Sequence, residues 1–285
     1  MFDLGKVKSF MVIGAHCDDV EGRTGAIFSR LVRQGARGTY VVAVENPYVG
    51  AGVELNDAMK ALETRREESR AGAAVLGAAR IEFFAFKSYY LYTAERELIF
   101  PAFRDREEVE AMAAKAVYYG LPPINNAYLF PECVARLTDL IAEEKPDLII
   151  THASNDRHPD HYGVARFVDL VVGDLNDQGA GIELWFRDPG AGAPLDGWRP
   201  QILVEVSAED VEISQRALDC FPSQHPKGID GFVERRTKQY GRLAGVPYAQ
   251  GFTVAGRTRK GSWDDDEGFA AIIAAVTAPF VVYPL

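Results

Sequence analysis

The sequence predicts a three-layer α/β fold in which a mostly parallel sheet is covered by helices. Apolar runs typical of buried strands alternate with segments of helical periodicity, which favours parallel strands joined by right-handed crossovers. The 285 residues are 47% apolar, enough to bury a sizeable core. A disordered or fibrous chain is therefore excluded.

The expected elements follow one another along the chain. The apolar run at 9–15 indicates a strand, and a helix follows it because Ile27, Leu31 and Val32 recur at helical spacing before Gly35. Further strands are expected at 38–45, 80–86, 147–153, 183–186 and 201–207. Further helices are expected over 57–77, 133–145, 208–221 and 231–245.

A segment at about 87–131 interrupts the alternation. It is rich in tyrosine, phenylalanine and proline and is not needed to build the sheet, so we interpret it as an insertion. Such excursions are usually lids or partner surfaces, and aromatic rings can stack on sugars, although packing alone explains them equally well. With no repeat or low-complexity linker, we expect one domain over 1–285 with a C-terminal elaboration.

Composition narrows the class of partner. A net charge of -10 disfavours nucleic acid and anionic membranes, which leaves a small molecule as the expected partner. Three widely spaced cysteines and an N-terminus without signal-peptide character favour the cytoplasm. Residues 268–285 carry no charge but contain two prolines, so we expect a terminal helix and strand packed on the core or on a subunit of a homo-oligomer.

The stretch "AHCDDVE" places polar groups directly behind the first strand. His16 and Asp19 are three residues apart and share one face if a helix begins here, so they could hold one ion. Asp18 would project roughly 100° away and could remain free as a base. Taken alone, this pair is more typical of a helix-capping turn.

A second cluster, "HPDH", follows the strand at 147–153. His158 and His161 repeat the three-residue spacing around Asp160. Ligand sites of open α/β sheets lie beyond the carboxyl ends of the strands, so the two clusters are expected to meet. Two histidines and one aspartate leave a position for water, as in catalytic zinc sites. We expect His152 to be a core residue and His225 a loop residue.

Other chemistries find little support in the sequence. It has no G-x-S-x-G elbow, and "EGRTG" lacks the spacing of a phosphate-binding loop. Cys17 could be a nucleophile paired with His158, but a role as loop filler is simpler beside a metal-ligand pair.

These motifs resemble those of the LmbE-like (PIG-L) zinc de-N-acetylases, A-H-P-D-D-x-E and H-P-D-H. The similarity continues through "TRREESRAGAAVLG", "ISQRALDCFPSQ" and "YAQGF", and implies a Rossmann-like fold. It also implies roles for individual residues. These are His16, Asp19 and His161 as zinc ligands, Asp18 as general base, Asp160 as the group orienting a charged His158, and Arg65 as a substrate contact. Ferrous iron suits the same ligands.

The chain departs from the family pattern at three places. Cys17 replaces proline, and Phe221 stands where a histidine is common before "SQ". Arg23 and Thr24 replace a glycine-rich stretch, and Arg23 would either bind an anionic substrate group or pair with a carboxylate.

The leading hypothesis is a zinc-dependent hydrolase that removes an N-acyl group, most simply acetyl, from an amino sugar or sugar conjugate. The alternative is a metal-dependent hydratase or lyase acting on an unsaturated carboxylate, since a metal and a carboxylate base can also add water across a double bond. A binding protein with a relic metal site is a third hypothesis, disfavoured because binding needs neither Asp18 nor His158.

Overall fold

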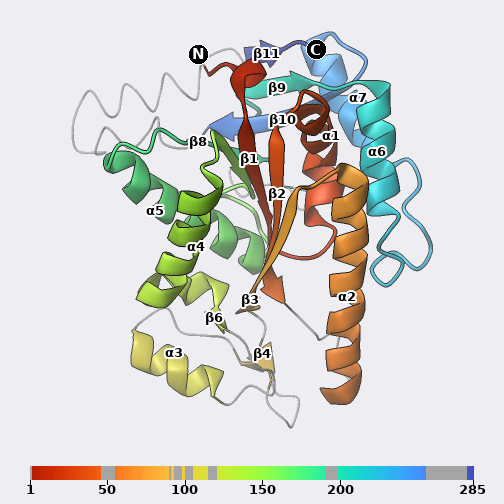
Figure 1. Cartoon of the computed structure of the whole chain (residues 1–285). Coiled ribbons are helices and arrows are strands. Elements are labelled where there is room, and N and C mark those ends of the chain that lie inside the picture. Colours follow the sequence, from red (N-terminus) through yellow and green to blue (C-terminus); the bar gives the residue numbers. More distant parts are fainter. Residues whose placement is uncertain are drawn as a thin grey trace.

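The computed structural model contains an open, mostly parallel sheet, which confirms the predicted fold class (Figure 1). It describes residues 2–45, 55–89, 91–92, 98–99, 105–114, 121–189, 198–254 and 281–285. The strands of the main sheet are β1 (Ser9–Gly14), β2 (Arg37–Glu45), β3 (Arg80–Lys87), β6 (Leu121–Pro123), β7 (Leu148–Thr151), β8 (Glu183–Arg187), β9 (Ile202–Glu205), β10 (Ala249–Val254) and β11 (Val281–Tyr283). Their order is β11-β9-β10-β8-β7-β1-β2-β3-β6, and only β10 runs antiparallel to its neighbours.

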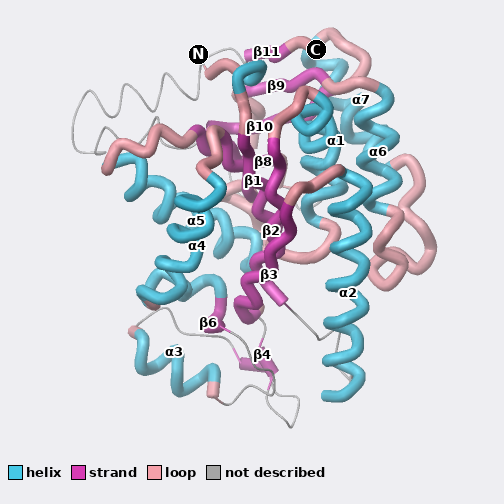
Figure 2. The backbone as a smooth tube through the Cα atoms, viewed as in Figure 1, coloured by secondary structure: helices cyan, strands magenta, loops and turns pink. Residues whose placement is uncertain are grey.

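Helices cover both faces of the sheet (Figures 1 and 2). One face carries α1 (Asp19–Arg33), α2 (Leu55–Leu76), α6 (Ala208–Leu218) and α7 (Phe232–Ala244). The other face carries α4 (Pro131–Glu144) and α5 (Pro159–Asp177). The strand period of two sends Phe10 against Phe28 of α1 and Met11 into the opposite core, which also contains Phe167 of α5.

Strand β1 lies between β2 and β7 and is parallel to both. The three strands therefore end at one edge of the sheet, where the chain enters α1 and α5. Gly14 allows the tight turn after β1, because a Cβ there would lie 3.0 Å from Cβ of Asp19. The two predicted polar clusters are thus brought to the same edge.

The predicted insertion contributes more to the sheet than we expected. Its described parts contain the β4 (Leu91–Tyr92) and β5 (Leu98–Ile99) pair, the helix α3 (Arg106–Ala113) and β6. Strand β6 pairs with β3, so the expectation that this segment adds nothing to the sheet is wrong. The limits of the insertion and the single domain stay predictions.

Outside the insertion, helix α5 and strand β10 had no counterpart among the predicted elements. The predicted terminal strand corresponds to β11, whereas the predicted terminal helix falls in 255–280, outside the described residues. Within the described ranges, no helix combines the length and the apolar character needed to cross a bilayer.

Glu144 joins the end of α4 to the starts of β2 and β3. Its carboxylate accepts hydrogen bonds from Arg37 Nε (3.1 Å), Thr39 Oγ1 (2.8 Å) and Arg80 Nη1 (2.9 Å). Burial alone would raise the pKa of Glu144, but these partners outweigh it and lower the pKa to about 2. The anionic carboxylate therefore stabilises the folded state.

We predict that Glu144→Gln lowers the free energy of unfolding by roughly 1–3 kcal/mol at neutral pH, since two guanidinium groups lose their anion. Because the folded-state pKa is depressed, this stabilisation is present above the ordinary pKa of 4.5 and is lost as the pH falls towards about 2. Denaturant unfolding at neutral and acidic pH measures the difference. Glu143→Gln is the comparison: this exposed carboxylate also pairs with Arg80, at 2.9 Å, and its loss should cost less than that of the buried Glu144. A difference between wild type and Glu144→Gln that persists in acid contradicts the prediction.

Candidate active site

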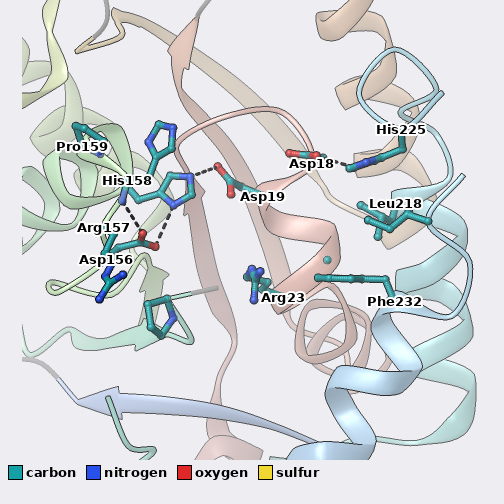
Figure 3. A pocket seen from close by; sticks show the side chains of 14 residues that line it. Asp18, Asp19, Arg23, Asp156, Arg157, His158, Pro159, Leu218, His225 and Phe232 are labelled. Carbon is teal, nitrogen blue, oxygen red and sulfur yellow. Dashed lines mark hydrogen bonds and ion pairs between the residues drawn. The ribbon is translucent and has the colours of Figure 1, made fainter. Parts of the chain in front are cut away.

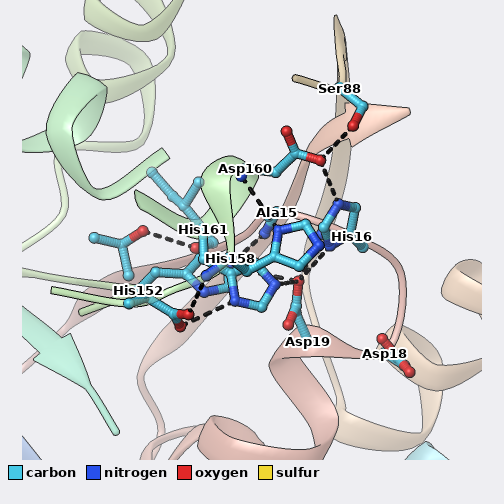
Figure 4. Close-up of polar contacts among 12 residues, drawn as sticks. Ala15, His16, Asp18, Asp19, Ser88, His152, His158, Asp160 and His161 are labelled. Carbon is cyan, nitrogen blue, oxygen red and sulfur yellow. Dashed lines mark hydrogen bonds and ion pairs between the residues drawn. The ribbon is translucent and has the colours of Figure 1, made fainter. Parts of the chain in front are cut away.

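The loops after β1 and β7 meet around the carboxylate of Asp19 (Figure 4). Asp19 Oδ2 lies 3.4 Å from His16 Nδ1 and 3.4 Å from His161 Nε2. The backbone N–H of His16 also donates to this oxygen at 2.7 Å, which holds the carboxylate in place. Two residues predicted from the first motif and one from the second are therefore neighbours in space.

Each of these two histidines has a second carboxylate at its far ring nitrogen. Asp160 Oδ2 lies 3.0 Å from His16 Nε2, and Asp156 Oδ2 lies 3.0 Å from His161 Nδ1. A carboxylate at one nitrogen holds the proton there and leaves the other nitrogen as a donor for a metal. The free nitrogens are the ones that face Asp19.

This arrangement corrects the predicted pairing of Asp160 with His158. The Asp160 carboxylate also accepts from Ser88 Oγ (2.6 Å) and Tyr89 N (2.6 Å), so it is committed to His16 and to the start of the insertion. Only the backbone N–H of Asp160 reaches His158, donating to Nδ1 at 3.2 Å.

The surroundings of His158 favour the neutral imidazole over the charged ring that we predicted. Burial, reinforced by the nearby His16 and His161, lowers its pKa to about 4. Since Nδ1 accepts the Asp160 N–H, the remaining ring proton belongs on Nε2. His158 can therefore still donate a hydrogen bond as a neutral imidazole.

Asp18 turns away from His16, His158 and His161, as Figure 4 shows. Its left-handed backbone (φ 81°) precedes α1 and sends the carboxylate towards His225, whose Nε2 lies 2.8 Å from Oδ2. Burial raises the pKa of Asp18, and the hydrogen bond from His225 offsets this in part. A carboxylate with a raised pKa beside a metal-ligand cluster suits a general base.

Arg187 at the end of β8 is a member of the site that the sequence did not indicate. Its side chain is 2% exposed, and Nη2 lies 2.8 Å from Asp19 Oδ1 and 2.7 Å from His152 Nδ1. Burial alone would raise the pKa of Asp19, but His161, His152 and Arg187 hold it well below its usual range. Asp19 is therefore anionic, as a metal ligand must be.

The described residues contain two overlapping groups whose ligand atoms all lie within 4.8 Å of one another. One comprises His16, His158 and His161, and the other Asp19, His152 and His161. His152 Nε2 already accepts the backbone N–H of Ala15 at 2.7 Å, which weighs against its binding a metal. The predicted set of His16, Asp19 and His161 draws on both groups, and its imidazole and carboxylate donors fit a divalent metal.

The cluster opens into a pocket of about 540 Å³ (Figure 3). Asp18, Arg23, His158 and His225 are among its lining residues, with an apolar wall that includes Phe232. The pocket therefore offers a polar end beside the histidines and an apolar surface opposite.

Arg65 is not among the residues that line this pocket. It lines a separate cavity of about 20 Å³ beside His16 and Cys17. The Gln224 side-chain amide is oriented with its oxygen towards the donors of Ser223 and Arg65. In this orientation the oxygen accepts a hydrogen bond from Arg65 Nε at 2.7 Å. Arg65 therefore ties α2 to the loop that carries His225, and a direct substrate contact stays a prediction.

Two of the departures from the family pattern are buried. Burial raises the pKa of the Cys17 thiol well above its ordinary value, which gives no support to a nucleophilic role. Phe221 is fully buried, and the imidazole nearest to Asp18 comes from His225, four residues later. Nothing in its local sequence marked His225 for this place, whereas Asp156 stands two residues before the second motif.

A family model described as GlcNAc-PI de-N-acetylase (PIG-L) matches residues 11–172, more than half of the chain. The chain belongs to this family. The matched region contains both motif clusters, while Arg187 and His225 lie beyond it.

Solved structures share the fold of this PIG-L family member. The N,N'-diacetylchitobiose deacetylase from Pyrococcus horikoshii aligns with a TM-score of 0.61 and 19% identity, over 89% of this chain and 87% of its own. A zinc-inhibited form of teicoplanin deacetylase aligns with a TM-score of 0.61 and 17% identity, over 90% of this chain and 100% of its own. The 4-carboxy-2-hydroxymuconate hydratase from Pseudomonas putida aligns with a TM-score of 0.61 and 18% identity, over 87% of this chain and 96% of its own. At these identities the likeness extends to the fold alone.

Zinc binding by single-residue variants distinguishes the predicted ligand set from the two overlapping groups. We predict that His161→Ala abolishes stoichiometric zinc, that Asp156→Asn lowers zinc affinity about 10–100-fold, and that His158→Ala retains zinc. Elemental analysis and competition with a chromogenic chelator measure this. Loss of zinc in His158→Ala with retention in Asp19→Ala would contradict the predicted set.

Proposed function

We propose that this protein is a metal-dependent amidohydrolase that removes an N-acyl group, most simply acetyl, from an amino sugar or sugar conjugate. One observation carries the proposal. The Asp19 carboxylate lies between His16 and His161 at the carboxyl edge of the sheet, with Asp18 beside it on the wall of a pocket. Membership of a de-N-acetylase family supports the same reaction.

His16, Asp19 and His161 would hold the metal, zinc in this proposal, with ferrous iron as the alternative that the same ligands suit. When bound, the ion supplies Lewis acidity to the acyl oxygen and lowers the pKa of the attacking water. Asp160 and Asp156 hold the protons of His16 and His161 on the nitrogens that face away from Asp19.

Asp18 takes a proton from the attacking water and returns it to the nitrogen of the departing amine. Its place on the pocket wall and its raised pKa suit both transfers. His158, neutral with its proton on Nε2, donates a hydrogen bond to the oxyanion that forms as the amide carbon becomes tetrahedral. The amide and one water molecule are thereby converted to a carboxylic acid and an amine, which ionise to a carboxylate and an ammonium ion.

A second candidate is the hydration of an unsaturated carboxylate. It is favoured by the hydratase among the structures that share the fold. The same base would take the proton from water, which would then add to carbon, and no amine would be released. Detection of a new primary amine separates the two reactions.

We also propose a small-molecule substrate and a cytoplasmic location. Cys17, Cys133 and Cys220 are all free, which suits a reducing compartment. A homo-oligomeric state stays a prediction of the sequence.

The central test replaces the proposed base. Asp18→Asn should lower kcat for N-acetyl sugars by roughly 10²–10⁴-fold while zinc binding is retained, because only the proton acceptor is removed. Amine release measured with fluorescamine over a panel of N-acetylated amino sugars gives the rate. A zinc-loaded Asp18→Asn protein that deacetylates as fast as the wild type contradicts the proposal.

His225 should act as a positioning residue for Asp18. We predict that His225→Ala lowers kcat roughly 10-fold with little change in KM, since the base loses the hydrogen bond that orients it. His225→Gln, which keeps a donor, should recover part of the rate, and Lys227→Ala at an exposed position of the same loop is the matched control. Equal losses in the alanine and glutamine variants would point to a structural role instead.

A further inference from the structure

We propose that the pocket selects a substrate bearing an anionic group, which Arg23 binds about one helical turn from the acyl group. This inference rests on the proposed deacylation for the position of the acyl group. It names a substrate class, namely N-acyl amino sugars that also carry a phosphate or a carboxylate.

Arg23 is placed by α1 relative to the metal-ligand cluster. It stands four residues after Asp19, so both side chains leave the same face of the helix, with Cβ atoms about 5–6 Å apart. Arg23 lines the pocket with 15% of its side chain exposed. Figure 3 shows it on the wall between Asp19 and Phe232, whose ring centroid lies 5.5 Å from the guanidinium carbon. The ring restricts where the guanidinium can lie.

The positive charge of Arg23 is not matched by a carboxylate of its own. Its ion pair joins Nη1 to Asp188 Oδ2 at 3.5 Å, and the same oxygen makes a shorter ion pair with Arg236. Nη1 is buried and donates no hydrogen bond to any described residue. Arg23 and Arg236 therefore share the carboxylate of Asp188.

Among the described residues, no ion pair joins Arg23 to the acidic side chains that line the pocket, because each of them is held by another partner. Asp18 pairs with His225, Asp19 with Arg187, and Asp156 with His161. At the rim, Arg157 adds a further cation. The guanidinium of Arg23 therefore keeps hydrogen-bonding capacity that the described residues do not use, which favours an anionic group on the ligand.

The remaining wall restricts the rest of the ligand. Leu218 and Phe232 lie across the pocket from His158 (Figure 3) and, with Ile229, give it apolar lining suited to the nonpolar face of a sugar ring. A guanidinium binds phosphate and carboxylate equally well through paired N–H donors. Arg23 lies about one helical turn from Asp19, so the amide and the anionic group of the substrate must be close together on one compact molecule.

Steady-state kinetics on matched substrates test the inference. N-acetylglucosamine is the neutral member, and the anionic members are its 1-phosphate, its 6-phosphate and N-acetylmuramic acid. We expect at least one anionic member to have a kcat/KM 10-fold or more above the neutral one. Arg23→Gln should lower that preference about 10–100-fold and leave the neutral substrate within about two-fold. The phosphate and carboxylate members distinguish the two sources of charge.

Three controls accompany the variant. Arg23→Lys keeps the charge without the fork and should retain part of the preference, while Arg242→Gln removes one exposed charge remote from the pocket and should change nothing. Thermal unfolding shows whether Arg23→Gln remains folded. In the wild type, inorganic phosphate should inhibit turnover of the neutral substrate competitively, which requires no variant.

Calorimetric binding of glucosamine 6-phosphate, glucosamine 1-phosphate and muramic acid, each against glucosamine, separates this inference from the proposed function. If no N-acetyl compound is hydrolysed but an anionic amine binds in an Arg23-dependent way, the deacylase proposal fails and the anion site stands. If all four substrates are hydrolysed equally well, or Arg23→Gln slows the neutral and the anionic ones alike, the anion site is refuted and the deacylase proposal survives.

Discussion

The parallel pairing of β1 with β7 is the constraint on which the site depends. The register places Phe10 opposite Leu148 and Val12 opposite Ile150, so both strands end at one edge of the sheet. Beyond them, Thr151 Oγ1 donates to the carbonyl of Ile13 at 2.9 Å, and the Ala15 N–H donates to His152. These contacts hold the two loops together. A one-residue slip would turn every side chain of the strand to the other face and separate the ligands.

Charge compensation around Asp19 is the second constraint. A buried carboxylate is costly unless it is paired, and here Arg187 and the two ligand histidines share the task. Asp156 and Asp160 extend the pairing outwards, so each polar group is oriented by the next. Such a network holds its donors ready before a metal or substrate arrives, which lowers the cost of organising the site.

The region beyond residue 172 completes what the family-matched part begins. Arg187 comes from β8 and His225 from the loop between α6 and α7, and both reach side chains of the first motif. The loop itself is fastened to α2 by Ser223 and Gln224, which contact Glu68 and Arg65. The general-base side of the pocket is therefore shaped by the C-terminal elaboration, and the metal side by the two motifs.

The sequence by itself determined the fold class, most strands and helices, and the meeting of the two motifs, because periodicity and strand-end placement are local signals with global consequences. It overlooked α5, whose continuous run of apolar and polar residues follows directly on a motif, and β10, whose glycine and glutamine obscured the strand pattern. Only the tertiary structure decided that Asp160 supports His16, that His225 meets Asp18, and that Arg187 reaches Asp19. These partners are separated by 144, 207 and 168 residues, and no local pattern encodes a contact between side chains that distant segments bring together.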